Sequence, residues 1–272
     1  MGLDASVMCN CYAQGRCTPC PFPAAFTIDD EGFPLLNLPQ QGHEADHDQF
    51  EEWLNTCCEH PGMDYLNRYI GSWKAYHAFR DALASIGWQY FRVLERTLPL
   101  ENHGQMSVVE ARFALQELNR FSSMEGIERP FLIHSETGEP VGNLAYGGVF
   151  HADARTGLQF KVEASGFSVI DTWEFNRELF RAMRFTQEVA ESDLERAASY
   201  RLTDLDTGRH FESSTPVKTF VQDTAGQMHQ HYPQRLHIEQ RTVEPAYFSA
   251  IVEPLQDVLR AALEMGNPIR WQ

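Results

Sequence analysis

Basic residues are scarce in this 272-residue sequence, which contains 22 Lys and Arg against 38 Asp and Glu and carries a formal net charge of −16. A field of that sign repels phosphate backbones and anionic lipid. The densest basic stretch holds Arg177, Arg181 and Arg184, a spacing typical of a solvated face. We therefore expect neither nucleic acid nor a membrane as a partner, and the charge favours a basic protein instead.

Long apolar runs are also missing. No stretch approaches the roughly 20 residues that cross a bilayer, and the first residues lack the basic start and apolar stretch of a secretory signal. The sequence thus indicates a cytoplasmic protein whose six cysteines are reduced rather than paired in an exported disulfide framework. "MGLDAS" fits a myristoylation pattern at Gly2, but no polybasic patch supplies a second anchoring signal. A strand in "LDASVMC" is the favoured interpretation.

The signatures of P-loop, dinucleotide-binding, zinc-protease and α/β-hydrolase enzymes are absent from the sequence. Residues 206–208 read Asp-Thr-Gly, the tripeptide of aspartic proteases, which need a second carboxylate and apolar flanks. Here Arg209 follows the glycine, and two similar turns carry Glu136 and Arg155 in place of the aspartate. These residues favour a hairpin turn over a protease site.

Helical patterns dominate the first 126 residues. Apolar residues and cysteines at i, i+3, i+4, i+7 and i+8 predict a helix within residues 46–60, with a capping box over residues 46–49. The residues of this stripe are Phe50, Trp53, Leu54, Cys57 and Cys58. Further helices are predicted within residues 72–87 and after a Ser-x-x-Glu start signal at residues 107–110.

After about residue 126 the pattern changes to short β-like runs separated by turns. Thr-Gly pairs at 137–138, 156–157 and 207–208 predict three hairpins, because glycine accepts the positive φ of a tight turn. Further strands are predicted in "GFSVIDTW", "LFRAMRFTQEV", "VKTFVQD" and "RLHIEQRTV". Residues 244–268 return to helical periodicity, with Gly266 placed to end the helix.

These patterns predict an α+β fold with two regions. Residues 1–126 are expected to form a mainly helical, cysteine-rich region. Residues 127–272 are expected to form an antiparallel β-sheet of hairpins and a C-terminal helix that packs back on one region or the other. No Pro- or Ser-rich linker marks the boundary, so two domains and one fused domain both remain open.

Two cysteine-rich segments form a candidate metal site. Four cysteines occur within twelve residues near the start, and a Cys-Cys-Glu-His run lies at the end of the first predicted helix. Thiolate and imidazole are ligands that zinc prefers, whereas the spacings differ from those of iron–sulfur proteins. Because a loop facing a helix end can close a tetrahedron, we predict that the two segments are in contact. The candidate ligands are Cys9, Cys11, Cys57, Cys58 and His60, with Cys17 and Cys20 as weaker candidates.

Two other interpretations of the cysteines remain open. Cys57 and Cys58 share a stripe with Trp53, and free cysteine is among the most buried residue types, so core packing explains these thiols without a metal. A functional thiol or disulfide switch is the third interpretation. Adjacent residues on a helix point about 100° apart, so we expect at most one of the pair to face the N-terminal loop.

A histidine pair is a weaker metal candidate. His229 and His231 are two residues apart, the spacing that brings both rings to one face of a strand, and such a pair can bind zinc or iron when further ligands arrive. Gly226 precedes the pair and Pro233 follows it. These flanks favour a surface turn.

The chain resembles a group of bacterial proteins that open with "MGLDxxVMCNCY", through the further segments "CCEHPGMDY", "LFRAMRF", "IVEPL" and the closing "GNPIRW". The group has no assigned activity, so no catalytic residue is carried over. The resemblance implies that Cys9, Cys11, Cys57, Cys58 and His60 match positions kept in the group, whereas Cys17 and Cys20 match positions that often hold proline or threonine. It therefore favours contact between "CNC" and "CCEH", through metal or through packing.

Two functions follow from these features. The first is an acidic binding protein that covers a basic partner, such as a toxin nuclease, and gains association rate from its charge. The second is a zinc- or thiol-dependent hydrolase or transferase that acts beside His60, with Glu59 or Asp64 as proton carrier. The charge and the missing motifs favour the binding protein.

Overall fold

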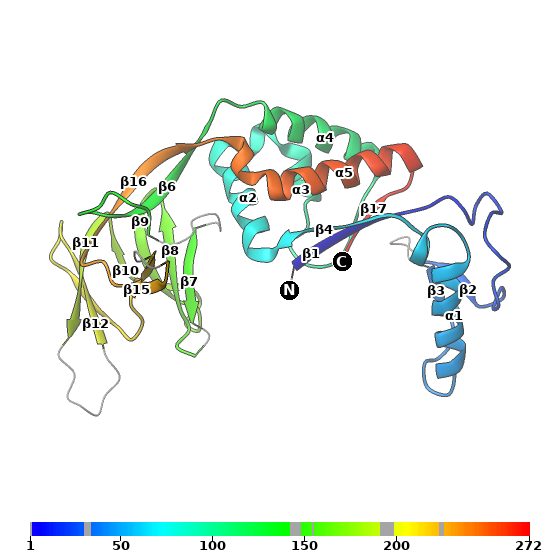
Figure 1. Cartoon of the computed structure of the whole chain (residues 1–272), viewed down its shortest axis with the longest axis horizontal. Coiled ribbons are helices and arrows are strands. Elements are labelled where there is room, and N and C mark those ends of the chain that lie inside the picture. Colours follow the sequence, from blue (N-terminus) through cyan, green and yellow to red (C-terminus); the bar gives the residue numbers. More distant parts are fainter. Residues whose placement is uncertain (1, 30–33, 142–147, 154, 191–198, 223–225) are drawn as a thin grey trace. The chain divides into compact units, whose positions relative to one another are not determined.

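The computed structural model describes residues 2–29, 34–141, 148–153, 155–190, 199–222 and 226–272 (Figure 1). They form helices and antiparallel sheets, which confirms the α+β prediction. The chain divides into two compact units. The first comprises Met1–Tyr76, Ile86–Glu125 and Pro245–Gln272, and the second comprises His77–Ser85 and Gly126–Glu244.

An antiparallel sheet with the strand order β4-β1-β17-β5 forms the centre of the first unit. Its strands are β1 (Gly2–Met8), β4 (Asp64–Ser72), β5 (Gln105–Met106) and β17 (Ile269–Trp271). Leu3, Ala5 and Val7 alternate along β1 and are fully buried, which confirms the predicted N-terminal strand. Because β17 pairs with β1, the C-terminal helix belongs to this unit, whereas the sequence pattern grouped it with the β-rich region.

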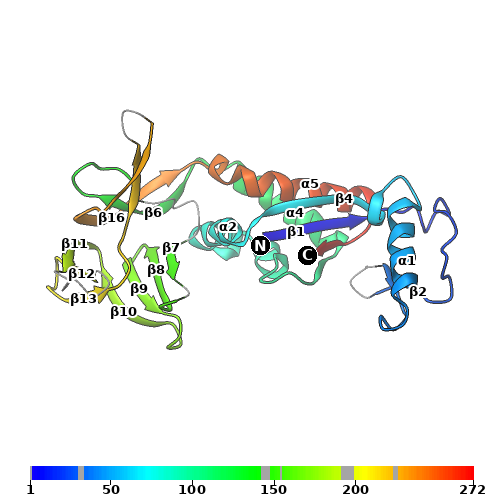
Figure 2. The same ribbon diagram turned by 60° about the horizontal axis from the view of Figure 1, so that its bottom comes forward.

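Helices pack on this sheet and on one another. α5 lies beside α4 and contacts β4 and β1 (Figure 2). It ends at Gly266, whose φ of 71° is the left-handed cap expected there. The predicted helices at 72–87, after 107 and within 244–268 are thus confirmed. The helices are α2 (Trp73–Ile86), most of which belongs to the second unit, α3 (Arg92–Thr97), α4 (Val108–Ser122) and α5 (Ser249–Met265).

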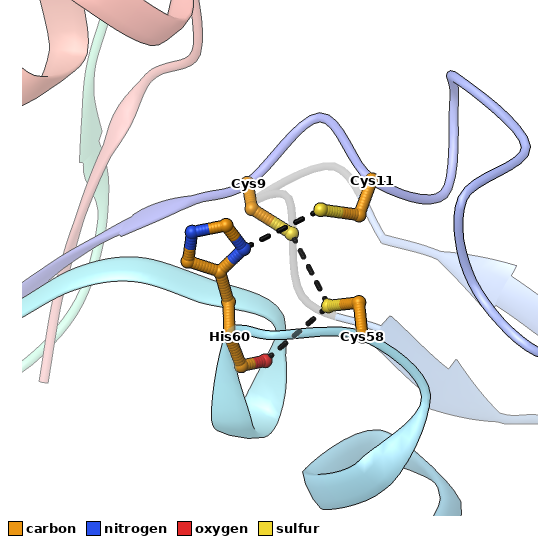
Figure 3. A group of neighbouring side chains, drawn as sticks. All are labelled: Cys9, Cys11, Cys58 and His60. Atoms are coloured by element: carbon orange, nitrogen blue, oxygen red, sulfur yellow. Dashed lines mark hydrogen bonds between the residues drawn. The ribbon is translucent and has the colours of Figure 1, made fainter.

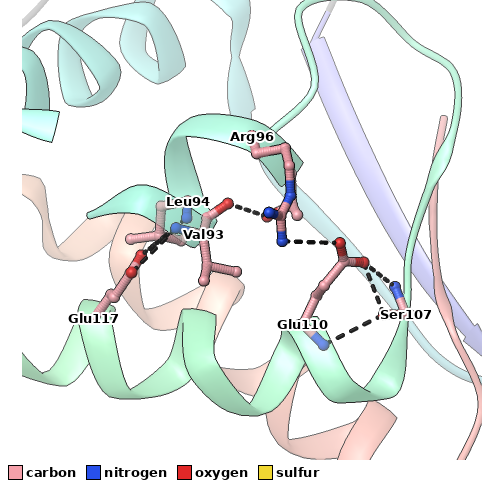
Figure 4. Close-up of polar contacts among 7 residues, drawn as sticks. Val93, Leu94, Arg96, Ser107, Glu110 and Glu117 are labelled. Atoms are coloured by element: carbon pink, nitrogen blue, oxygen red, sulfur yellow. Dashed lines mark hydrogen bonds and ion pairs between the residues drawn. The ribbon is translucent and has the colours of Figure 1, made fainter. Parts of the chain in front are cut away.

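Two carboxylates satisfy the free N–H groups at the helix starts (Figure 4). α3 was not predicted, because its start is capped from another helix: Glu117 of α4 accepts hydrogen bonds from the backbone N–H of Val93 at 3.1 Å and of Leu94 at 2.9 Å. α4 begins with the predicted capping box. The Ser107 hydroxyl accepts from the Glu110 N–H at 3.3 Å, and the Glu110 carboxylate accepts from the Ser107 N–H at 3.0 Å.

Residues 9–63, which we call the cysteine module, connect β1 to β4. The module contains the short hairpin β2 (Phe26–Ile28) and β3 (Pro34–Leu36), and the helix α1 (Glu44–Thr56). The rings of Phe26, Phe50 and Trp53 meet with centroids 5.6 to 6.0 Å apart. The helix is confirmed, but its predicted capping box is wrong: the N-cap of α1 is His43, three residues before the predicted N-cap Asp46, and the His43 ring is hydrogen-bonded to the Asp46 carboxylate at 2.7 Å.

The second unit is built from antiparallel strands. Two larger sheets, ordered β10-β9-β8-β7 and β13-β12-β11-β16-β6, share one hydrophobic core, in which the ring of Phe167 stacks on that of Phe185 at 4.6 Å. The strands are β6 (Ile127–His134), β7 (Val149–Asp153), β8 (Leu158–Glu163), β9 (Gly166–Asp171), β10 (Arg177–Ala182), β11 (Arg184–Ala190), β12 (Ser199–Asp204), β13 (His210–Ser213), β14 (Thr219–Gln222), β15 (Met228–His231) and β16 (Arg235–Val243).

The three Thr-Gly turns lie where the sequence placed them. Gly138, Gly157 and Gly208 have φ values of 72°, 68° and 73°, the left-handed conformation that required glycine. One strand prediction is wrong, because "LFRAMRFTQEV" is not one strand. It breaks at Met183, and the strands on either side, β10 and β11, belong to different sheets. Buried residues alternate up to Ala182 and again from Phe185, and two consecutive exposed residues, Met183 and Arg184, shift the pattern at the corner.

Candidate metal centre

Strand pairing brings the two cysteine-rich segments together. β1 pairs with β4 in antiparallel register, with Met8 opposite Asp64. The residues that follow β1 and the residues that precede β4 therefore lie at the same end of the sheet. The N–H of Cys9 continues the pairing by donating to the Met63 carbonyl at 2.7 Å.

A tight turn carries the chain from α1 into β4. Cys57 is the C-cap of α1, and its N–H donates to the Trp53 carbonyl at 2.7 Å. Pro61 then opens a single 3₁₀ turn in which Gly62 and Met63 have φ values of 67° and 60°. This reversal is the local reason that the residues after the helix face the segment after β1.

Four potential ligand atoms meet at this point (Figure 3). The Sγ atoms of Cys9 and Cys58 are 3.8 Å apart, and Cys11 Sγ is 3.4 Å from His60 Nδ1. All four atoms lie within 4.8 Å of one another. The predicted contact between the two segments is confirmed, and the group could hold a metal ion.

The spacing fits tetrahedral coordination. With zinc–sulfur bonds of about 2.3 Å and zinc–nitrogen bonds of about 2.0 Å, two sulfur ligands lie about 3.8 Å apart and a sulfur and a nitrogen about 3.5 Å apart. The separations of 3.8 Å and 3.4 Å are close to these values. A disulfide needs about 2.05 Å, and all six cysteines are free thiols.

The thiols differ in how readily they ionise. Burial raises the pKa of Cys9 to about 12, from an ordinary value of 9.0. Burial also opposes ionisation of Cys58, but hydrogen bonds with the His60 backbone and with neighbouring thiols outweigh it and lower the pKa of Cys58. Of Cys9 and Cys58, Cys58 therefore loses its proton first as the pH rises.

Cys57 lies in a second group of thiols. Its Sγ, Cys17 Sγ and Cys58 Sγ lie within 4.8 Å of one another. Both members of the Cys57–Cys58 pair thus contact the N-terminal loop, and the expectation that at most one would is wrong. The physical reason is that Cys57 keeps the αR conformation at the C-cap, whereas Cys58 lies beyond the end of α1, so helical geometry does not fix the direction of the Cys58 side chain.

The remaining cysteine of the loop is placed differently. Cys20 packs at the edge of the same apolar cluster, and its sulfur accepts a hydrogen bond from the Phe22 N–H at 3.4 Å. Within the part of the chain that the structure describes, Cys20 belongs to neither ligand group. It therefore provides a natural control for the other cysteines.

The two predicted proton carriers both contact arginines. Glu59 pairs with Arg16 at 3.1 Å in an exposed position. The Asp64 carboxylate accepts a hydrogen bond from Arg270, which is nearly fully buried, and another from Asn67 at 3.3 Å. Burial raises the pKa of Asp64, and the Arg270 charge opposes that shift.

The histidine pair forms a strand rather than the predicted turn. His229 and His231 lie on β15, an exposed strand that pairs with β14, opposite Val221 and Thr219. The ring of His231 meets that of His134 edge-on at 5.4 Å. Among the residues described here, neither histidine joins a group of three ligands, because the pair sits on a two-stranded ribbon.

The basic stretch of the sequence is neutralised by carboxylates. Arg177 pairs with Glu174 at 2.8 Å, and Arg181 pairs with Glu163 and Glu178. Arg184 pairs with Asp206, and this contact lowers the pKa of Asp206. These pairs explain why the stretch makes no basic patch. The Asp-Thr-Gly segment is a hairpin turn, as predicted. Its aspartate, Asp206, forms the ion pair with Arg184.

The acidic charge is concentrated in the cysteine module, a feature that the sequence reasoning missed. Residues 17–67 contain ten Asp and Glu and no Lys or Arg. Four of the ten are exposed on α1: Glu44, Asp48, Glu51 and Glu52. A charge profile along the chain, in place of a single net charge, reveals this block.

Comparisons with known proteins give no match to any family model, curated protein or solved structure. Among the described residues, no helix has the length and apolar character needed to span a bilayer.

Proposed function

We propose that Cys9, Cys11, Cys58 and His60 bind zinc and that the ion is structural. One observation carries the proposal: four thiol and imidazole atoms from two distant segments lie within 4.8 Å of one another, and the Cys9–Cys58 and Cys11–His60 separations are close to those of a zinc tetrahedron. Four protein ligands complete the coordination of the ion. A catalytic zinc ion instead keeps one position for water or substrate.

The size of the cysteine module supports a structural role. Its apolar cluster has few fully buried side chains, and three of them are cysteines: Cys9, Cys11 and Cys57. A core this small stabilises a fold of about 55 residues only marginally. Metal binding supplies the missing stability in many small domains, because the site forms only in the folded state.

We further propose that the module is the surface through which the protein binds a basic protein partner. The block without Lys or Arg contains ten of the acidic residues, and α1 displays four of them. Such a field steers a basic partner and raises its association rate. Zinc would then hold the acidic helix in place.

The alternative is a zinc- or thiol-dependent hydrolase or transferase at the same cluster. It needs an open metal position or an accessible thiol, and a free proton carrier. Four protein ligands leave no open position on the metal ion. Glu59 and Asp64, the two expected proton carriers, are paired with Arg16 and Arg270. These contacts favour the binding protein.

Elemental analysis tests the zinc proposal. Protein made without a histidine tag and passed through a weak chelator should retain zinc. His60→Ala should lower the zinc content, whereas His103→Ala, an exposed histidine of the same unit, should not. Zinc-free protein with unchanged melting after chelation would contradict the proposal and leave the thiols as core residues.

Affinity capture tests the partner proposal. A variant with Glu44→Gln, Asp48→Asn, Glu51→Gln and Glu52→Gln should lose a basic partner that the wild type retains at low salt and releases at high salt. A control with the same charge change elsewhere should retain the partner: Glu125→Gln, Glu136→Gln, Glu139→Gln and Glu244→Gln, all exposed. Equal retention of the partner by both variants would exclude α1 as the binding surface. Substrate turnover by the wild type that is abolished in a folded His60→Ala variant would favour the enzyme.

A further inference from the structure

A second group of thiols lies directly beside the first. Cys17, Cys57 and Cys58 have sulfur atoms within 4.8 Å of one another, and Cys58 belongs to both groups. Cys57 is buried, whereas Cys17 and Cys58 are half-buried. The six residues of the two groups therefore form one continuous cluster around the sulfur of Cys58.

Backbone contacts hold Cys17 in this place. The N–H of its neighbour Thr18 donates to the Cys57 carbonyl at 2.9 Å, and the Thr18 carbonyl accepts from the indole N–H of Trp53 at 3.0 Å. Trp53 is itself buried in the apolar cluster. The loop is thus fixed to α1 through both backbone polar groups of Thr18, so the approach of Cys17 to Cys57 is built into the fold.

The geometry points to a second zinc ion, bound by Cys17, Cys57 and Cys58, with the sulfur of Cys58 bridging the two ions; the inference rests on the zinc proposed at the first site. Thiolate is a soft ligand that suits zinc, and a thiolate sulfur has lone pairs for two ions. Each thiol releases its proton on binding. The half-buried position of Cys17 and Cys58 leaves a water molecule as the fourth ligand of the second ion.

Charge balance permits the second ion. The first ion with three thiolates carries a net charge of −1. Cys17 and Cys57, once deprotonated, add two negative charges, and the second Zn²⁺ adds two positive charges. Five thiolates with two Zn²⁺ therefore keep the net charge of −1, so the second ion brings no additional net charge into the apolar environment.

Zinc stoichiometry in three untagged proteins tests the inference. The wild type should contain two zinc ions per chain, Cys17→Ser should contain one, and Cys20→Ser should contain two. Cys17 lies on a half-buried loop, so its variant should remain folded, which circular dichroism checks. Cys20→Ser is the matched control, because it removes a thiol of the same loop that lies outside both groups.

Cadmium provides an independent probe of the bridge. In protein loaded with ¹¹³Cd, a shared Cys58 sulfur should give two resonances that split each other, and Cys17→Ser should leave one unsplit resonance. One zinc ion in both the wild type and Cys17→Ser, with a single resonance, would overturn the second site and leave the first intact. Two ions in Cys17→Ser would also overturn it. No zinc in any of the proteins would overturn both sites.

Discussion

Cys9 Sγ lies 3.8 Å from Cys58 Sγ, although 49 positions separate the two residues in the sequence. The distance joins the segment after β1 to the segment before β4, and it results from the pairing of these strands together with the turn at Pro61–Met63. The metal centre is therefore a consequence of the sheet register. A change that shifts this register by one residue would turn the cysteines to the opposite face.

Cys9→Ser should remove a ligand and destabilise the cysteine module. Cys9 is 2% exposed, so a hydroxyl in its place is buried without the metal, at a cost of about 1 to 3 kcal/mol in the free energy of unfolding. Thermal denaturation monitored by tryptophan fluorescence measures the loss, because Trp53 lies in the same cluster. Cys20→Ser should melt nearly like the wild type, and an equal loss in both variants would contradict a specific role for Cys9.

Chelation should open the cysteine module to proteolysis at sites that are protected in the metal-bound protein. Phe50 and Trp53 are buried in the module, and chymotrypsin cleaves after such residues only when they are exposed. Metal-free protein should therefore be cut near residues 50–53, as mass spectrometry of the fragments will show. Trypsin should not cut between residues 17 and 67, which lack Lys and Arg. Cleavage at residues 50–53 before chelation would mean that metal does not hold the module together.

The capping box of α4 should contribute stability that depends on pH. Hydrogen bonds from the Ser107 side chain and backbone lower the pKa of Glu110 below its usual 4.5. A carboxyl group with a lowered pKa stabilises the fold above its unfolded pKa, and this contribution is lost as the pH falls through the folded value. At pH 7, Glu110→Gln should therefore be less stable than the wild type by about 1 kcal/mol or less in the free energy of unfolding. This difference should shrink below about pH 4.5. A difference that grows on acidification would contradict this assignment.

Gln187 should be a strong stabilising residue of the second unit. Its buried side chain donates to the carbonyls of Val217 at 2.9 Å and Pro233 at 3.3 Å, and accepts from the Val217 N–H at 2.6 Å. Gln187→Leu leaves these backbone groups unpaired, so we expect a loss of about 1 to 3 kcal/mol in a denaturant titration. Gln240→Leu on β16 changes an exposed glutamine and should have little effect. Similar midpoints for the two variants would argue against the role of Gln187.

The elements that local signals determine could be predicted from the sequence. The Ser107–Glu110 start signal, the three Thr-Gly hairpins and the Gly266 stop each depend on residues close in the chain. α3 could not be predicted in this way, because Glu117 of another helix caps its start. The corner at Met183 was missed because strand-like residues continue across it, and the shift in the alternation of buried residues between Ala182 and Phe185 depends on tertiary packing.

The candidate site was predictable in part for the same reason. Ligand chemistry identified Cys9, Cys11, Cys58 and His60 as candidates, because all six cysteines fall in two segments and His60 lies in the second of them. The sequence did not separate Cys57 from Cys58. Their assignment depends on where α1 ends and on how Thr18 is held against Cys57 and Trp53, both of which are tertiary facts.

The pairing of β1 with β17 has a consequence for synthesis on the ribosome. Strand β17 lies between β1 and β5, so the central sheet of the first unit stays open until residues 269–271 have emerged. The second unit needs only residues up to 244. The nascent chain can therefore complete its second unit first. The sheet that contains β1 and β4 is completed only when β17 has been synthesised, although β1 and β4 are made earlier.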